Sequence, residues 1–158
     1  MLLAIYGLRV SELTGLSLDD FDWENETFTV GRAKGGRAQQ YPLQFEAGGA
    51  IAQYLKHERP TCTSRHLFVT IRPPHHRVGV QTVQNLVSER MTKLGIQTNH
   101  LGPHALRHAC ATQLLKRGAS LRDIAEFLGH RDLRSVSIYA KVDSHALMAV
   151  ADYRMEVL

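Results

Sequence analysis

The chain has 158 residues, of which 44% are hydrophobic and 22% charged, a balance typical of one soluble globular domain with its own core. No segment approaches the roughly 20 consecutive apolar residues of a membrane helix, and the two cysteines, Cys62 and Cys110, exclude a disulfide scaffold, so we expect a cytoplasmic protein without a membrane partner. The net charge of +4 and a sequence pI of about 9.3 favour an anionic partner such as nucleic acid.

The first part of the chain predicts two short helical segments followed by a β-hairpin. Residues 2–6 resemble the end of a helix that Gly7 terminates, and Ser11 is a suitable N-cap residue for the next helix. Residues 27–30 are rich in β-formers, and residues 39–43 can return as their partner strand after a Lys-Gly-Gly-Arg turn. We therefore expect a small antiparallel sheet near the N-terminal end.

Helices dominate the middle of the chain. A helix is predicted over residues 45–57, and a short apolar strand is predicted over residues 67–69. Apolar residues at helical spacing indicate a further helix over residues 83–91, which Gly95 terminates. Another helix is expected from Pro103 to about Arg117.

The C-terminal part continues in helices. Ser120 and Asp123 resemble a capping box, and apolar residues at 121, 124, 125 and 128 form one buried stripe. Two more helices are expected, one capped by Asp132 and one that begins near Ser144. The predicted fold is α+β, a mostly helical domain with a small antiparallel β-sheet near the N-terminal end.

The segment His104-Ala-Leu-Arg107-His108 has the strongest chemical pattern in the chain. On one helix these three named residues share a side, while Leu106, Ala109 and Cys110 are expected to face a core. Groups that carry positive charge repel one another unless an anion lies between them. The segment therefore indicates either an anion site or an ordinary solvated basic face.

Other segments carry weaker signals, each with an ordinary structural alternative. His130 follows a helix-ending glycine, where histidines often only cap the helix. Tyr139 lies on an expected amphipathic helix, where a tyrosine is usually half-buried core. Arg9 has Glu12 three residues later, which alone predicts a surface ion pair. Lys34 lies at the expected hairpin tip, a common place for a solvated lysine.

The order of these segments resembles the tyrosine recombinase family, which includes phage integrases and Xer-like recombinases. The resemblance spans nearly the whole chain, in the segments GLRVSELTGLSLDDFD, GRAKGGRAQQYPL, HALRHACATQLLKRGASLRDIAEFLGH and IYAKV. It implies site-specific DNA recombination, as in integration and excision, by strand cleavage and rejoining through a 3′-phosphotyrosine intermediate. It also implies six catalytic residues: Arg9, Lys34, His104, Arg107, His130 and Tyr139.

The roles that this resemblance implies are chemically reasonable. The planar forks of two arginines match the non-bridging oxygens of a phosphodiester and stabilise its transition state. Tyr139 is the implied nucleophile, with His104 as a base, and Lys34 is the implied acid for the leaving 5′-oxygen. His130 donates a hydrogen bond to the phosphate in this scheme. The implied reaction requires neither a cofactor nor a metal.

The resemblance also sets expectations for domains and partners. Family members normally carry a separate N-terminal DNA-binding domain, so residues 1–158 correspond to the catalytic domain without that domain and without part of its first helix. The implied partner is double-stranded DNA, with a homo-tetramer on paired sites for a full-length protein. Six basic residues are candidates for phosphate contacts, although ordinary surface charge explains each equally well: Arg32, Arg37, Arg65, Arg72, Arg77 and Lys141.

Two alternatives remain open from sequence. The chain can be a non-catalytic DNA-binding or regulatory fragment of a recombinase, which binds DNA without cutting it. The other alternative is a zinc site formed by His104, His108 and His130, because histidines at i and i+4 on a helix can share a metal. Arg107 between the first two histidines opposes cation binding, so we expect no metal there.

Overall fold

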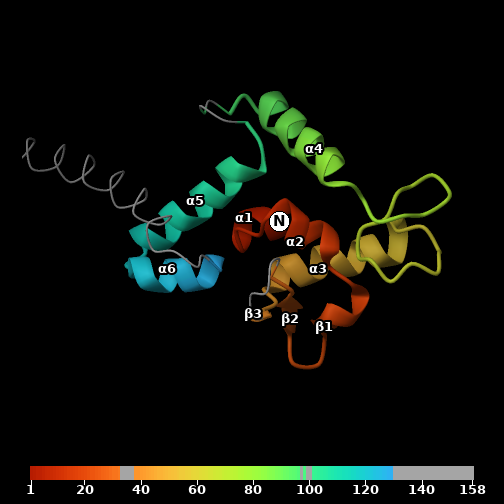
Figure 1. Cartoon of the computed structure of the whole chain (residues 1–158), viewed down its shortest axis with the longest axis horizontal. Helices are drawn as coiled ribbons and strands as arrows, with labels where there is room; N and C mark the ends of the chain where they lie inside the picture. Colours follow the sequence, from red (N-terminus) through yellow and green to blue (C-terminus); the bar gives the residue numbers. More distant parts are fainter. Residues whose placement is uncertain (33–37, 97, 99–100, 130–158) are drawn as a thin grey trace, which may run out of the picture. The chain divides into compact units, whose positions relative to one another are not determined.

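The computed structural model describes residues 1–32, 38–96, 98 and 101–129 (Figure 1). The chain divides into two compact units, Met1–Arg107 and His108–Leu158. The boundary falls within helix α5 (Pro103–Lys116).

The first unit contains short helices, a small sheet and two longer helices. In Figure 1 the strands and α4 lie on opposite sides of α1 and α2. The elements in chain order are α1 (Leu2–Ile5), α2 (Val10–Gly15), the 3-10 turn η1 (Leu18–Asp20), β1 (Phe21–Asp22), β2 (Thr27–Val30), β3 (Gln39–Pro42), α3 (Phe45–Gln53), the π-helical turn η2 (Tyr54–Glu58), α4 (Val80–Lys93) and the start of α5.

The sheet has three antiparallel strands in the order β1-β2-β3. Phe28 of β2 lies opposite Phe21 of β1 and Tyr41 of β3. The expected small antiparallel sheet is therefore confirmed, and the two-residue strand β1 is an addition that the sequence did not indicate. Alternation along β2 buries Phe28 and Val30, whose side chains are fully enclosed.

An aromatic cluster joins this sheet to α1. The Phe28 ring packs edge-on against Tyr6, with centroids 4.9 Å apart, and stacks on Tyr41 at 5.5 Å. The Tyr6 hydroxyl donates to the carbonyl of Pro42 at 2.9 Å and accepts from the backbone N–H of Gln44 at 2.8 Å. These contacts fix the end of α1 against the end of β3, and they thereby place the turn that follows α1.

That turn differs from the sequence prediction in how the next helix begins. Gly7 ends the first helix with a positive φ of 59°, as its position predicts. Helix α2 begins at Val10 with Arg9 as its N-cap residue, so the prediction that Ser11 caps it was wrong. The carboxylate of Glu12 accepts the Arg9 backbone N–H at 2.8 Å and takes over the capping function.

Two further predictions in this unit need correction. Residues 67–69 form no strand, because their backbone pairs with irregular segments through isolated bridges, Ser17 with His66 and Val69 with Arg77. The expected helix over residues 45–57 is present, but it changes from α to π geometry at Tyr54.

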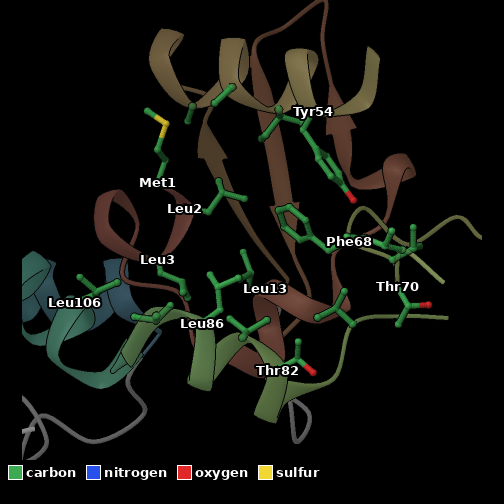
Figure 2. Close-up of a pocket in the computed structure, with 18 of the residues that line it drawn as sticks. Met1, Leu2, Leu3, Leu13, Tyr54, Phe68, Thr70, Thr82, Leu86 and Leu106 are labelled. Carbon is green, nitrogen blue, oxygen red and sulfur yellow. The ribbon is translucent and has the colours of Figure 1, made fainter. Parts of the chain in front are cut away.

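An apolar cavity of about 770 Å³ lies between α1, α3, α4 and the segment around Phe68 (Figure 2). Leu86 of α4 lines it and is 56% exposed, whereas Met91 on the same helix is buried. The apolar residues that occur at helical spacing on α4 are therefore only partly covered by the rest of the protein. Few polar groups line this cavity, so it does not provide the reaction chemistry considered below.

The second unit contains the rest of α5 and helix α6 (Leu121–Leu128). Ser120 caps α6, and its hydroxyl accepts the Asp123 backbone N–H at 3.2 Å, as the sequence predicted. The core of the unit consists of Cys110, Ala111, Ile124, Ala125 and Leu128. Ala109 is exposed, contrary to expectation. The helices predicted from Asp132 and Ser144 lie outside the described residues.

Candidate functional site

Arg9 and Glu12 form a pair at the start of α2. A side-chain nitrogen of Arg9, Nη1, lies 2.8 Å from Glu12 Oε1. The Glu12 side chain is only 1% exposed, whereas that of Arg9 is 42% exposed. The pair is therefore not the solvated surface pair that spacing alone suggests, because a buried carboxylate supports a guanidinium that remains accessible.

A second arginine reaches the same carboxylate from the sheet. Arg32 follows β2, and its Nη1 also lies 2.8 Å from Glu12 Oε1. Its other terminal nitrogen donates to Gln39 Oε1 and to the Tyr41 hydroxyl. With its side chain only 7% exposed, Arg32 is not the surface phosphate contact that the sequence suggested.

The charged groups around Glu12 keep its carboxylate ionised. Burial raises the pKa of Glu12, but hydrogen bonds from the Arg9 backbone and from the Arg32 side chain, with the positive charge of Arg32, outweigh burial and lower it. Burial raises the pKa of Tyr41, so this phenol stays neutral as it accepts from Arg32. The cluster thus combines one buried anion, two cations and a neutral hydroxyl.

Arg107 brings α5 to the turn that carries Arg9. Its Nη1 donates to the carbonyl oxygen of Gly7, two residues before Arg9. The side chain is buried, so of the two alternatives for this segment, an anion site or a solvated basic face, the second does not hold for Arg107. The Arg107 guanidinium instead contacts the turn that precedes Arg9.

The other nominated residues are placed less fully. His104 lies one helical turn before Arg107 on α5 and is exposed. Lys34, His130 and Tyr139 lie outside the described residues. Of the nominated residues, Arg107 contacts Gly7 in the turn before Arg9, and Arg9 lies in a cluster with Glu12, Arg32 and Tyr41. Nothing local in the sequence indicated that Arg32 and Tyr41 join this cluster, since their pairing depends on how the sheet packs against α2.

Basic residues elsewhere on the first unit are more open. Arg65 pairs with Asp19, and both side chains are 64% exposed. Arg72 and Arg77 are exposed in the segment between η2 and α4. These three side chains are therefore accessible, as a contact with phosphate would require. Arg37 and Lys141 lie outside the described part of the chain.

The described part of the chain holds neither a cluster of metal-ligating side chains nor a membrane-spanning helix. No group of three or more histidine, cysteine, aspartate or glutamate side chains in that part of the chain is arranged to hold a metal ion. The zinc site that was left open as an alternative includes His130, which lies outside the described residues. No helix in the same residues has the length and hydropathy to cross a membrane.

The small antiparallel sheet and the mostly helical remainder define the class of fold to which the chain belongs. The profile of the Phage integrase family matches residues 1–145. The chain therefore belongs to the phage integrase family, as its sequence motifs predicted.

Two tyrosine recombinases of similar sequence support the same assignment. The tyrosine recombinase XerA of Pyrococcus furiosus is 37% identical over 142 residues, covering 89% of this chain and 48% of the relative. The tyrosine recombinase XerC of Syntrophus aciditrophicus is 34% identical over 152 residues, with 92% and 48% coverage. The chain thus spans about half the length of these two relatives.

Solved structures match the fold as well. The crystal structure of XerA recombinase has a TM-score of 0.80 and 30% sequence identity, covering 97% of this chain and 55% of that one. A post-cleavage complex of XerH site-specific recombinase, bound to its palindromic difH substrate, has a TM-score of 0.77 and 25% identity. It covers 95% of this chain and 43% of that one.

Proposed function

We propose that this chain is the catalytic domain of a site-specific tyrosine recombinase that cleaves and rejoins double-stranded DNA. One observation supports the proposal beyond family membership: Arg107 donates to the carbonyl of Gly7, two residues before Arg9. Two guanidiniums at one turn can hold the non-bridging oxygens of a single phosphodiester.

In this scheme Tyr139 attacks the phosphorus and forms a 3′-phosphotyrosine bond as the 5′-oxygen leaves. A free tyrosine has a pKa of about 10, so the hydroxyl must lose its proton to a base, for which His104 is the candidate. Lys34 donates the proton that the leaving 5′-oxygen requires, and His130 donates a hydrogen bond to the phosphate. Attack by the 5′-hydroxyl of another strand on the phosphotyrosine bond reverses the step and releases Tyr139. The bond that breaks is replaced by the bond that forms, so the scheme needs no cofactor.

The natural partner in this proposal is double-stranded DNA, and the full-length protein acts as a homo-tetramer on paired sites in the cytoplasm. The solved XerH relative is bound to its DNA substrate, which supports the choice of partner. The basic composition of the chain supports it independently.

Trapping of the covalent intermediate tests the proposal. The substrate is a pool of duplexes with randomised sequence, each nicked close to the scissile position so that the short 5′-hydroxyl fragment diffuses away after cleavage. We expect a denaturant-resistant protein–DNA adduct that disappears in Tyr139→Phe, whereas DNA binding in a mobility-shift assay persists. Binding without any Tyr139-dependent adduct would instead identify a non-catalytic DNA-binding fragment.

A further inference from the structure

Arg32 is a buried cation to which the reaction outlined above gives no part. We propose that Arg32 is a positioning residue for strand cleavage, which holds Glu12 so that Glu12 orients Arg9, and which offsets the charge of Glu12 so that Arg9 remains available to the phosphate. This inference rests on the proposed function, since it concerns how Arg9 holds a scissile phosphate.

The hydrogen bonds to Glu12 show why Arg32 is needed for orientation. Its carboxylate accepts the Arg9 backbone N–H at 2.8 Å through Oε2, while Oε1 accepts from both Arg9 and Arg32, each at 2.8 Å. Within the described part of the chain, the hydrogen bonds that remain without Arg32 come only from Arg9 itself. Arg32 is thus the contact through which the Arg9–Glu12 pair is attached to the sheet.

Arg32 is itself held firmly by the sheet. Its second terminal nitrogen donates to Gln39 and to the Tyr41 hydroxyl, both on β3. The Tyr41 ring belongs to the aromatic cluster and stacks on Phe28. The planar guanidinium can therefore bridge β3 and α2 with little freedom, a geometry that lysine cannot reproduce.

The charge balance gives the second part of the proposal. Two arginines and one glutamate leave one net positive charge at the cluster, whereas Arg9 and Glu12 alone are neutral as a pair. The buried carboxylate attracts Arg9 and repels an approaching phosphate. Arg32 offsets that repulsion although its side chain is too buried to serve as a surface contact for DNA.

Replacement of Arg32 by methionine tests both parts, with Lys93→Met as the matched control, because Lys93 forms an exposed ion pair with Glu89. We expect Arg32→Met to slow single-turnover adduct formation by roughly 10- to 100-fold, the scale of a small misplacement of a catalytic group. The salt dependence of DNA binding should keep its slope, because a lost phosphate contact would lower that slope by about 0.9. Lys93→Met should cleave at the wild-type rate.

Two further variants separate charge from orientation. Arg32→Lys keeps the charge but loses the fork, and we expect it to recover only part of the rate. Glu12→Gln combined with Arg32→Met restores the net charge of the cluster, and we expect it to cleave faster than Arg32→Met alone. A double variant no faster than Arg32→Met would overturn the charge offset.

A measurement that does not require activity distinguishes this inference from the proposed function. We expect nitrogen-15 relaxation to show an ordered Arg9 guanidinium in the wild type and in Lys93→Met, and a mobile one in Arg32→Met. Equal order in all three overturns the positioning role, even if no variant forms an adduct and the proposed function itself fails. An adduct rate in Arg32→Met equal to that of the wild type overturns the catalytic consequence. If Arg32→Met does not fold, Arg32→Lys replaces it in both measurements.

Discussion

Arg107 donates a hydrogen bond from its guanidinium to the carbonyl oxygen of Gly7, although 100 residues separate them along the chain. The contact joins the segment that carries His-x-x-Arg to the turn that carries Arg9. The donor is Nη1 of the Arg107 guanidinium, and the side chain that carries it is buried. This hydrogen bond therefore holds one proposed catalytic arginine, Arg107, near the turn that carries the other, Arg9.

Replacement of Arg107 by lysine should reduce adduct formation by about 100- to 1,000-fold, the range for loss of a preorganised transition-state donor. Lysine keeps the charge, but it cannot hold Gly7 and grip a phosphate with one planar fork. Single-turnover cleavage under saturating DNA checks the prediction, with Arg65→Lys as the control. Wild-type cleavage by Arg107→Lys would show that charge alone is sufficient at this position.

Replacement of Lys34 by alanine should impair cleavage of ordinary DNA far more than cleavage of DNA whose scissile 5′-oxygen is replaced by sulfur. A thiolate leaves without a proton because thiols are much more acidic than alcohols, so the general acid is no longer needed. Adduct formation on the two substrates gives the comparison. Arg107→Lys should be slow on both, and an equal defect of Lys34→Ala on both would remove its role as acid.

Replacement of Glu12 by glutamine should destabilise the first unit by roughly 1–3 kcal/mol at neutral pH, the scale of hydrogen bonds to a charged group. The pKa of Glu12 is lowered in the folded protein, so its stabilising effect is present above the ordinary glutamate pKa of about 4.3 and is lost as the pH falls through the folded value. Urea unfolding of both proteins across a pH series should therefore show their difference shrinking in acid. A difference that grows below pH 4 would contradict this sign.

Replacement of Phe28 by alanine should cost about 3–5 kcal/mol, because it leaves a cavity in a tightly packed cluster. Phe28 is fully buried among Tyr6, Phe21 and Tyr41. The matched control is Phe45→Ala, since Phe45 is 91% exposed and its loss should change stability by less than about 0.5 kcal/mol. Chemical denaturation measures both, and similar losses for the two variants would exclude Phe28 as the centre of this core.

Local rules predicted much of the secondary structure. The helix over residues 103–116, the Ser120 cap and the glycine at 129 all depend on neighbours within one or two helical turns. The same rules failed at Ser11 and at residues 67–69, where the outcome depended on distant partners. Glu12 takes over the capping function at α2, and residue 67 bonds to the backbone of Leu16.

Motif order and helical periodicity are properties of the linear chain, so the family, the mostly helical α+β class and the nomination of Arg9 and Arg107 could be predicted without coordinates. The burial of Glu12, the sharing of its carboxylate by Arg32 and the contact of Arg107 with Gly7 could not. Those contacts join residues 20 and 100 positions apart. Their formation depends on how the sheet and α5 pack against the first turn, and short-range propensity carries no information about such packing.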